Sequence, residues 1–384
     1  MNNSSNVKRV IKLLHDSRRE KHVSIQHLCD GICTKSMLEK VELGKRKLNP
    51  FYLNRLLARL GIDQKRYEKY LYRAEYDKWK IRNEILDFID NGDLISAEEM
   101  ADRFERECGE RDKIGLQFCK FVKAQILQCR GTNDNELFRL YQDALLMTVP
   151  NAYETEMKKL LLSADEYNLV LECRYRELGE SDISEIFEIY EGLIGYIDKI
   201  GYEDSIRAKV YPKTIVHLWS FIDKQKEEMD SKYKIYLFFR ILEYCDNSIV
   251  LLRQNRLFYY LYEVLQIRVE VLGYISNSDI KDDKKQGYRV MLFETEEELK
   301  KYKEKCRSLK ISPYTLNCSY LYREEGVFCI NELVQSRRET MGMTMRALSD
   351  NICSDRTISR FETKSCNTHG DIVNELCVRL GITW

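Results

Sequence analysis

Proline and glycine are scarce in this sequence, and their scarcity bears on the fold. The chain has 384 residues, of which 4 are Pro and 17 are Gly, while 32% are charged. Because these two residue types interrupt helices and build tight turns, their scarcity argues against a strand-and-turn fold and predicts long helices. The length is sufficient for two or three domains, each with its own core.

Long apolar runs are absent as well. No stretch of about 18 or more apolar residues occurs, so the sequence predicts no transmembrane helix and no membrane partner. The N-terminal sequence MNNSSNVKRVIKLLHDSRRE lacks the apolar core and the small-residue cleavage site of a secretory signal. We therefore expect a cytoplasmic protein.

Signatures of disulfide frameworks, metal sites and catalysis are missing too. The 13 cysteines include no Cys-x-x-Cys pair and fall on apolar helical faces, which favours free buried thiols in a reducing compartment. The one local cluster is Cys29 and Cys33 with His27, where a metal site is the alternative to core and turn positions. No Gly-rich phosphate loop, Gly-x-Ser-x-Gly or His-Glu-x-x-His motif occurs, so we expect no enzyme and no cofactor.

The net charge is zero over the whole chain, but it is unevenly distributed. Residues 1–62 carry thirteen basic and five acidic side chains, a net charge of +8. Residues 329–384 are neutral, so residues 63–328 carry −8. A basic head on an acidic body is expected when only the head binds a polyanion.

An internal repeat brackets the chain. Residues 11–62 align with residues 330–382 when one residue is inserted in the second copy, giving seventeen identities. The identities include the Ser-Arg-Arg-Glu run at 17–20 and 336–339. We therefore expect both copies to have the same fold.

Each copy is predicted to be a short helical bundle. Turns are expected at Gly31 and Gly44, and Asn351 stands in the second copy where the first has Gly31. Glycine and asparagine adopt the left-handed conformation most readily, as a tight turn between helices requires. Ser24 is the expected N-cap of the second helix, and Cys33 or Thr34 opens the third.

The sequence LCDGICTKSMLEKVELGKR, residues 28–46, resembles the helix-turn-helix of the XRE class of DNA-binding domains (Cro/C1-type repressors). Its short turn and Gly-Ile-Cys run most resemble the peptide-pheromone-responsive regulators of Gram-positive bacteria, the PlcR/NprR/Rgg type. Residues 348–364 share the pattern in Ile-Cys-Ser and Thr-Ile-Ser-Arg-Phe-Glu. One departure is that this class usually has Gln at the start of the second helix, where this chain has Ile25 and Met345.

The resemblance implies that the third helix lies in the major groove of DNA, with its first residues at the base edges. The residues at these positions are Thr34, Lys35, Ser36 and Lys40. The residues that follow the helix and would contact the phosphate backbone are Lys45, Arg46 and Lys47. The alternative is that these lysines only solvate a surface, but their clustering on the motif favours DNA.

The resemblance also implies an ion pair that supports the fold. Repressors of this class commonly pair an arginine of the first helix with the glutamate that ends the recognition helix. The alignment assigns this role to Arg18 with Glu42, and in the second copy to Arg337 with Glu362.

The second copy keeps the core positions but loses most of the basic residues. Asp355 stands where the first copy has Lys35, and Ser365-Cys366-Asn367 replace Lys45-Arg46-Lys47. The candidates for a second DNA contact are Ser354, Arg356 and Arg360. The losses favour a copy that serves packing or dimerisation, and a second reader of DNA is the alternative. The core residues predicted to be buried together are Leu348, Ile352, Ile358, Phe361 and Leu376.

The region between the two copies is predicted to be helical throughout. Residues 63–90 read as one long helix, and residues 96–101 resemble the small-residue packing helix of a tetratricopeptide repeat. No clean 34-residue period can be registered, so an α-solenoid is predicted from helix spacing alone. The 25 tyrosines suit helix packing, and a peptide-binding face is the functional alternative.

These observations together predict an all-α protein with three domains. The expected segments are a helix-turn-helix domain at 1–63, a tetratricopeptide-like α-solenoid for sensing and dimerisation at 64–325, and a helix-turn-helix-like domain at 326–384. The expected function is that of a homodimeric transcriptional regulator that binds a double-stranded DNA operator and senses a ligand, with a short peptide as the candidate. The alternative is a tetratricopeptide-type interaction scaffold with vestigial DNA-binding heads.

Overall fold

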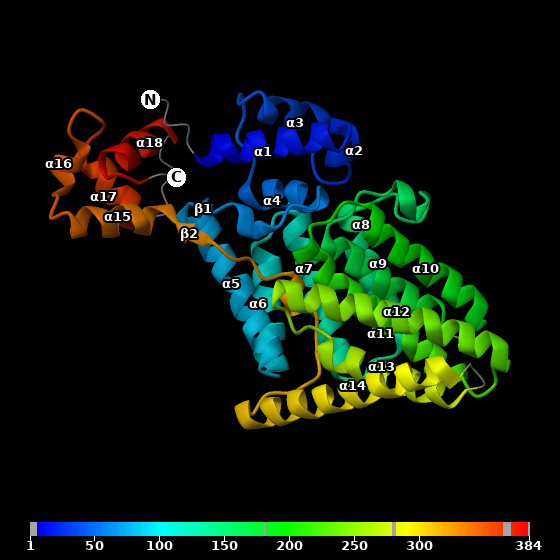
Figure 1. Cartoon of the computed structure of the whole chain (residues 1–384). Coiled ribbons are helices and arrows are strands. Elements are labelled where there is room, and N and C mark those ends of the chain that lie inside the picture. The colour runs from blue at the N-terminus through cyan, green and yellow to red at the C-terminus, as the bar shows by residue number, and fades with distance from the viewer. Residues whose placement is uncertain (1–5, 180, 279–281, 364–369, 383–384) are drawn as a thin grey trace. The chain divides into compact units, whose positions relative to one another are not determined.

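The computed structural model describes residues 6–179, 181–278, 282–363 and 370–382. In these ranges the chain forms eighteen α-helices, three short 3-10 turns and one pair of short strands (Figure 1). The predicted all-α class is confirmed. None of the described helices is both long enough and apolar enough to cross a membrane.

The chain folds into two compact units. The first unit combines residues 1–126 with residues 322–384, and the second contains residues 127–321. This division differs from the three predicted segments, because residues 64–126 group with both ends of the chain. The second unit is therefore inserted into the first.

The first unit begins with a four-helix bundle, named here the N-terminal bundle. Its helices are α1 (Asn6–Glu20), α2 (Ile25–Cys29), α3 (Lys35–Glu42) and α4 (Pro50–Arg59). Leu14, Leu28, Leu38 and Leu56 are completely buried between these helices. Apolar residues at helical spacing thus form the core of this bundle.

The same unit ends with a second four-helix bundle, named here the C-terminal bundle. Its helices are α15 (Ile330–Thr340), α16 (Met345–Ser349), α17 (Asp355–Thr363) and α18 (Gly370–Arg379). The two bundles have their helices in the same order, and the last three helices match in length to within one residue, while α1 is four residues longer than α15. The repeat detected in the sequence is therefore a repeat of structure.

Two short parallel strands join the segments next to the two bundles. After a 3-10 turn at Gln64–Arg66, strand β1 (Lys69–Leu71) pairs with β2 (Val327–Cys329), which leads directly into α15. Helix α5 begins only at Arg73, so the prediction of one helix over residues 63–90 is wrong for its first part. The partner strand lies more than 250 residues away along the chain, and local apolar spacing cannot indicate it.

A buried ion cluster fixes this strand pair. The Nζ of Lys69 donates to Oε2 of Glu324 at 2.9 Å, and Nη1 of Arg82 lies 3.8 Å from the other carboxylate oxygen. Burial alone would raise the pKa of Glu324, but the charges of Lys69 and Arg82 hold it below its ordinary value. The cluster links β1, α5 and the segment that precedes β2.

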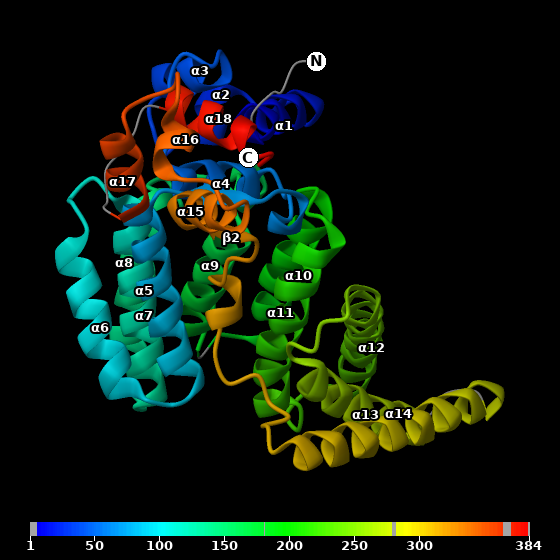
Figure 2. The same ribbon diagram turned by 90° about the vertical axis from the view of Figure 1, so that its left-hand side faces the viewer.

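The first unit is completed by three helices that follow β1. They are α5 (Arg73–Asp90), α6 (Leu94–Glu107) and α7 (Lys113–Cys129), whose last three residues fall in the second unit. Helices α5 and α6 form an antiparallel hairpin, which is clearest in Figure 2. Ala97 and Ala101 are completely buried on α6, where their small side chains permit close helix packing.

The second unit is a succession of helices in which most helices pack against the next one in the chain (Figure 1). The helices are α8 (Asp134–Thr148), α9 (Ala164–Glu177), α10 (Ile183–Lys199), α11 (Asp204–Gln225), α12 (Ser231–Asn255), α13 (Leu261–Asn277) and α14 (Asp282–Leu309). Two 3-10 turns, Met157–Lys159 and Ser319–Leu321, lie in the connections. This succession is the arrangement that the solenoid prediction requires.

Candidate functional site

The helix-turn-helix of the N-terminal bundle is held by an ion pair between Arg18 on α1 and Glu42 at the end of α3. The Nε and Nη2 of Arg18 each donate to one carboxylate oxygen of Glu42 at 2.7 Å, and Nη1 donates to the carbonyl of Val23 at 2.9 Å. Both charged side chains are nearly buried, and the hydrogen bonds to Glu42 raise the pKa of Arg18. The pair therefore fixes α3 against α1.

The turn between α2 and α3 is fixed from a second side. Gly31 occupies it with a φ of +71°, in the left-handed region that glycine adopts without strain. Arg59 of α4 donates to the carbonyl of Leu28, near the end of α2, at 3.2 Å and to that of Asp30, the C-cap of α2, at 2.7 Å. The direction in which α3 leaves the turn is thus set by α4 as well as by α1.

Both helices of the motif have side-chain caps at their N-termini. Ser24 Oγ accepts from the backbone N–H of His27 at 3.1 Å, and Thr34 Oγ1 accepts from that of Met37 at 3.2 Å. Because Thr34 uses its oxygen as the acceptor, its hydroxyl hydrogen is directed elsewhere and can be donated. The cap thus combines a structural role with a free donor at the start of α3.

All seven residues that the sequence assigned to DNA contact are exposed. They are Thr34, Lys35, Ser36, Lys40, Lys45, Arg46 and Lys47. The opposite face of α3 carries Leu38 and Val41, which are completely buried. The Nζ of Lys35 lies 3.9 Å from Glu39, a distant and solvated pair that leaves the ammonium group accessible. The N-terminal end of α3 and the segment after α3 thus present hydroxyl and cationic donors to solvent.

Sequence analysis overlooked Gln26, the second residue of α2. It is exposed, whereas Ile25 before it is partly buried. The cap at Ser24 fixes the first residue of α2 and thereby which residues of the first helical turn face inward, so that Ile25 faces the bundle and Gln26 faces solvent. The departure from the class at Ile25 is therefore accompanied by a glutamine one position later.

Cys29, Cys33 and His27 do not form a compact group of donors. Cys29 is completely buried, Cys33 is partly buried and His27 is exposed. Burial raises the pKa of Cys29, and it raises the pKa of Cys33 to about 11, so both thiols stay protonated at neutral pH. Within the described residues no group of three or more His, Cys, Asp or Glu side chains could hold a metal ion.

The C-terminal bundle repeats these arrangements at residue numbers that are 320 higher. Thr344 and Ser354 cap α16 and α17 as Ser24 and Thr34 cap α2 and α3. Asn351 takes the left-handed turn position with a φ of +57°. Further matches are the donations from Arg379 to the carbonyls of Leu348 and Asp350.

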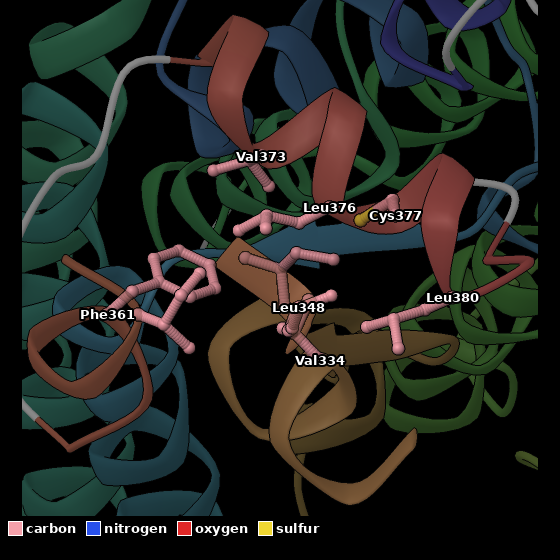
Figure 3. Packing of buried hydrophobic residues seen from close by; sticks show 9 residues of the cluster. Val334, Leu348, Phe361, Val373, Leu376, Cys377 and Leu380 are labelled. Atoms are coloured by element: carbon pink, nitrogen blue, oxygen red, sulfur yellow. The ribbon is translucent and has the colours of Figure 1, made fainter. Parts of the chain in front are cut away.

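The core of the C-terminal bundle contains the residues expected from the repeat. Leu348, Ile358, Phe361 and Leu376 are completely buried and pack together, while Ile352 is partly buried at the edge of the cluster. Figure 3 shows Leu348 and Phe361 of α16 and α17 directed toward Leu376 of α18 and Val334 of α15. This packing is independent of the basic residues that are missing from the second copy.

The ion pair of the C-terminal bundle uses Arg338, so the assignment of Arg337 is wrong. Arg338 donates from Nε and Nη2 to the two carboxylate oxygens of Glu362 at 2.7 Å, and from Nη1 to the carbonyl of Met343 at 3.0 Å. Arg337 is exposed, and within the described ranges its Nε donates to the carbonyl of Leu380. The spacing within the pair is 24 residues in both bundles. The two copies therefore align without the insertion assumed from the sequence.

The candidate DNA contacts of the second copy are also exposed. They are Ser354, Arg356 and Arg360, and Asp355 beside them is exposed as well. Ser365, Cys366 and Asn367, which align with the basic run of the first copy, lie outside the described residues. The comparison of the two copies therefore rests on the helix-turn-helix itself.

The second unit contains a buried polar cluster that sequence analysis missed, formed by Asn168, Glu172 and Arg176 of α9 and Lys213 and His217 of α11. The spacing of four residues along each helix places these side chains on one face of α9 and one face of α11. Lys213 is only 2% exposed. Its ammonium group donates to Oδ1 of Asn168 at 2.6 Å, to Glu172, and to Sγ of Cys318 at 3.0 Å.

The electrostatics of the buried polar cluster are strongly perturbed. Burial alone would raise the pKa of Glu172, but Lys213, His217 and Arg176 hold it well below its ordinary value. Burial, assisted by the charge of Lys213, lowers the pKa of His217 to about 3, so this imidazole is neutral at pH 7. Polar groups in such a cluster are expected to be fully hydrogen-bonded.

Four buried polar atoms at this cluster have no hydrogen-bond partner among the described residues. They are Nδ2 of Asn168, Nδ1 of His217 and the hydroxyl oxygen of Tyr190 on α10, and Nε of Arg176 is a fourth such atom, which lies 3.6 Å from Oδ1 of Asp134. A buried polar atom without a partner costs about 1–3 kcal/mol, so such atoms in a native structure call for water or a ligand. The cluster is therefore the candidate ligand site of the second unit.

Comparison with known proteins gives little beyond this geometry. No family model matches the chain, and no curated protein sequence matches it. Among solved structures, the complex of Bacillus thuringiensis PlcR with the peptide PapR7 and DNA is similar, with 11% sequence identity over 77% of this chain and 98% of that chain. The TM-score of 0.40 does not establish a common fold.

Proposed function

We propose that this chain is a sequence-specific transcriptional regulator whose N-terminal bundle inserts α3 into the major groove of an operator. The observation that carries this proposal is the exposed N-terminus of α3, where Thr34, Lys35 and Ser36 present donors on a helix fixed by the Arg18–Glu42 pair. A rigidly oriented helix with donors at its N-terminus is the device by which helix-turn-helix domains read bases.

The chemistry of these residues assigns them different partners. Lys35 can donate to O6 and N7 of guanine, while the Thr34 and Ser36 hydroxyls can serve bases or phosphates. Lys45, Arg46 and Lys47 follow α3 and are suited to the phosphate backbone, where they add affinity and salt dependence without sequence choice. The concentration of a net charge of +8 in residues 1–62 supports the same assignment.

We also propose that the second unit senses a ligand and that a short peptide is the candidate. The buried polar cluster supports this, because the unpartnered atoms of Asn168, His217 and Tyr190 match the N–H and C=O groups of a peptide. The test is affinity selection of random short peptides by the full-length protein, with an Asn168→Leu variant as control. Equal recovery of peptides by both proteins would count against this site.

The proposal as a whole is tested by selecting binding sites from random double-stranded DNA with the full-length protein. A regulator acting as a homodimer should recover a two-fold-symmetric site whose half-sites are one helical turn apart. An interaction scaffold with vestigial heads, the alternative function, should recover no preferred sequence. A preferred but asymmetric site would retain DNA reading and exclude the homodimer.

A further inference from the structure

The helix-turn-helix of the C-terminal bundle is as basic as that of the N-terminal bundle when the motifs alone are compared. Residues 344–361 carry three arginines and two aspartates, whereas residues 24–41 carry two lysines, one aspartate and one glutamate. The excess charge of the N-terminal head comes from residues outside this stretch. The neutrality of the C-terminal segment as a whole therefore does not describe the surface that would face DNA.

The three arginines of the second motif align with exposed residues of the first motif, two of which are proposed to contact DNA. With the offset of 320 residues, Arg356 corresponds to Ser36 and Arg360 to Lys40. Arg346, the second residue of α16, corresponds to the exposed Gln26 and was missed by sequence analysis. All three are exposed, and their guanidinium groups have no ion-pair or hydrogen-bond partner among the described residues.

We propose that the C-terminal bundle is a second DNA-reading head, which inserts α17 into the major groove and reads a G·C-containing element through Arg356 and Arg360. This goes beyond the proposed function, which assigns DNA contact to the N-terminal bundle. Arginine is suited to this task because its planar fork donates two hydrogen bonds to O6 and N7 of guanine. Arg346 at the start of α16 is suited to a phosphate.

Asp355 is compatible with this role. It is exposed at the first position of α17, where the N-terminal bundle has Lys35. A carboxylate at this position repels phosphates, but in the major groove it accepts a hydrogen bond from N4 of cytosine. Asp355 next to Arg356 therefore predicts a preference for a cytosine beside a guanine. The two heads then differ in the sequence that they read.

The fold of the C-terminal bundle does not depend on these arginines. Arg338 supplies the structural ion pair with Glu362, and the apolar core packs without any contribution from Arg346, Arg356 or Arg360. Arginines that are exposed, unpaired and absent from the core are available to a partner. Their arrangement on a helix-turn-helix favours DNA over an acidic protein surface.

The experiment compares full-length variants in site selection from random DNA and in affinity measured over a range of salt concentrations. The test variant is Arg356→Ala with Arg360→Ala, and its charge-matched control is Arg103→Ala with Arg106→Ala on α6, whose side chains are also exposed. A third variant, Arg356→Lys with Arg360→Lys, keeps the positive charge but lacks the planar guanidinium group that donates two hydrogen bonds to guanine. Equal unfolding midpoints would establish that all of them are folded.

We expect the alanine variant to lose the preference for guanine at one or two positions, with affinity for the wild-type site falling about tenfold to a hundredfold for each arginine–guanine pair. The lysine variant should keep the salt dependence and lose the base preference, while the control matches the wild type. Arg346→Ala should lower the log–log salt slope by about one unit.

The proposal is overturned if the alanine variant selects the wild-type site with wild-type affinity. It is equally overturned if only the oligomeric state changes, since the bundle would then serve dimerisation. Parallel measurement of a Lys45→Ala, Arg46→Ala, Lys47→Ala variant separates the two heads. If only the Lys45, Arg46 and Lys47 variant loses binding, the proposed function stands and the C-terminal bundle is not a second reader. If neither this variant nor the Arg356 and Arg360 variant loses binding, both proposals are wrong.

Discussion

Arg338, and not its neighbour Arg337, holds Glu362 in the C-terminal bundle, just as Arg18 holds Glu42 in the N-terminal bundle. The glutamate is 1% exposed and Arg338 is 8% exposed. A carboxylate buried to this degree is stable only while its partner is present. Arg338 is therefore expected to contribute far more to the stability of the fold than its neighbour Arg337.

This difference leads to the first prediction. Arg338→Ala should lower the free energy of unfolding of the first unit by roughly 3–5 kcal/mol, because it leaves Glu362 buried without a counter-ion. Arg337→Ala, at an exposed position, should change it by roughly 0.5 kcal/mol or less. Urea unfolding followed by circular dichroism measures both. Similar losses for the two variants would contradict the assignment.

The second prediction concerns the backbone contacts of the N-terminal bundle. Replacing Lys45, Arg46 and Lys47 by Ala should weaken binding to all DNA sequences alike, because phosphates carry no sequence information. The log–log salt slope should fall by about one unit for each phosphate that is no longer neutralised by a side chain. Fluorescence anisotropy at several salt concentrations measures the slope. A slope equal to that of the wild type would remove these residues from the interface.

The third prediction concerns base recognition by α3. Lys35→Ala should relax sequence choice at one base pair, at a cost of roughly 1–3 kcal/mol for the preferred base. The measurement is competition between the selected operator and single-base variants of it. A loss that is uniform over all sequences would move Lys35 to the class of residues that bind phosphates. Lys65→Ala, outside the helix-turn-helix, is a charge-matched control.

The fourth prediction concerns pH. The pKa of His217 is lowered to about 3 in the folded chain by burial, whereas an unfolded histidine titrates near 6.5. Below pH 6.5 the unfolded state therefore binds a proton that the folded state does not. Stability contributed by the neutral imidazole is present above pH 6.5 and is lost as the pH falls from 6.5 toward 3.

Between pH 7.5 and 5.5 this effect amounts to roughly 1 kcal/mol. His217→Gln should remove that part of the pH dependence of urea unfolding, while His27→Gln, an exposed control, should leave it in place. An unchanged pH profile in His217→Gln would show that the imidazole is not held neutral by its surroundings.

The sequence was sufficient to predict the local structure of the first bundle. The cap at Ser24 and the turn at Gly31 were placed correctly, and Thr34 was one of the two residues offered for the second cap, because each depends on a residue type at a fixed distance from apolar positions. Position-by-position transfer to the second copy succeeded for α16 and α17 for the same reason. The core residues Leu348 and Phe361 were thus found without a structure.

The first helix of the second copy shows where this reasoning fails. Alignment by the identical Ser-Arg-Arg-Glu runs shifts α15 by one residue, so that Leu14 is matched with Leu333. In the structure the completely buried counterpart of Leu14 is Val334. Because the run contains two adjacent arginines, Arg18 is matched with an arginine in either register, whereas a buried apolar position fits in one register, so the burial pattern and not the identity count decides the alignment.

The remaining misses have a common physical origin in contacts that are distant along the chain. The strand at Lys69–Leu71 is stabilised by residues near 328. The buried polar cluster depends on Lys213 meeting Glu172 across two helices. No local window contains either partner. Polar residues at every fourth position beside the apolar run Leu169–Leu171, as on α9, are the signal that could have indicated the cluster.

The pairing of β1 with β2 also sets the order in which the protein is completed during synthesis. Lys69 of β1 pairs with Val327 of β2. Because Val327 is synthesised much later than Lys69, β1 leaves the ribosome before its partner strand exists. At about 5–20 residues per second, this strand waits roughly 13–50 s for β2 to emerge. The inserted second unit has time to fold within that interval. The N-terminal bundle can therefore form early, while the pairing of β1 with β2 waits until residues 327–329 have emerged from the ribosome.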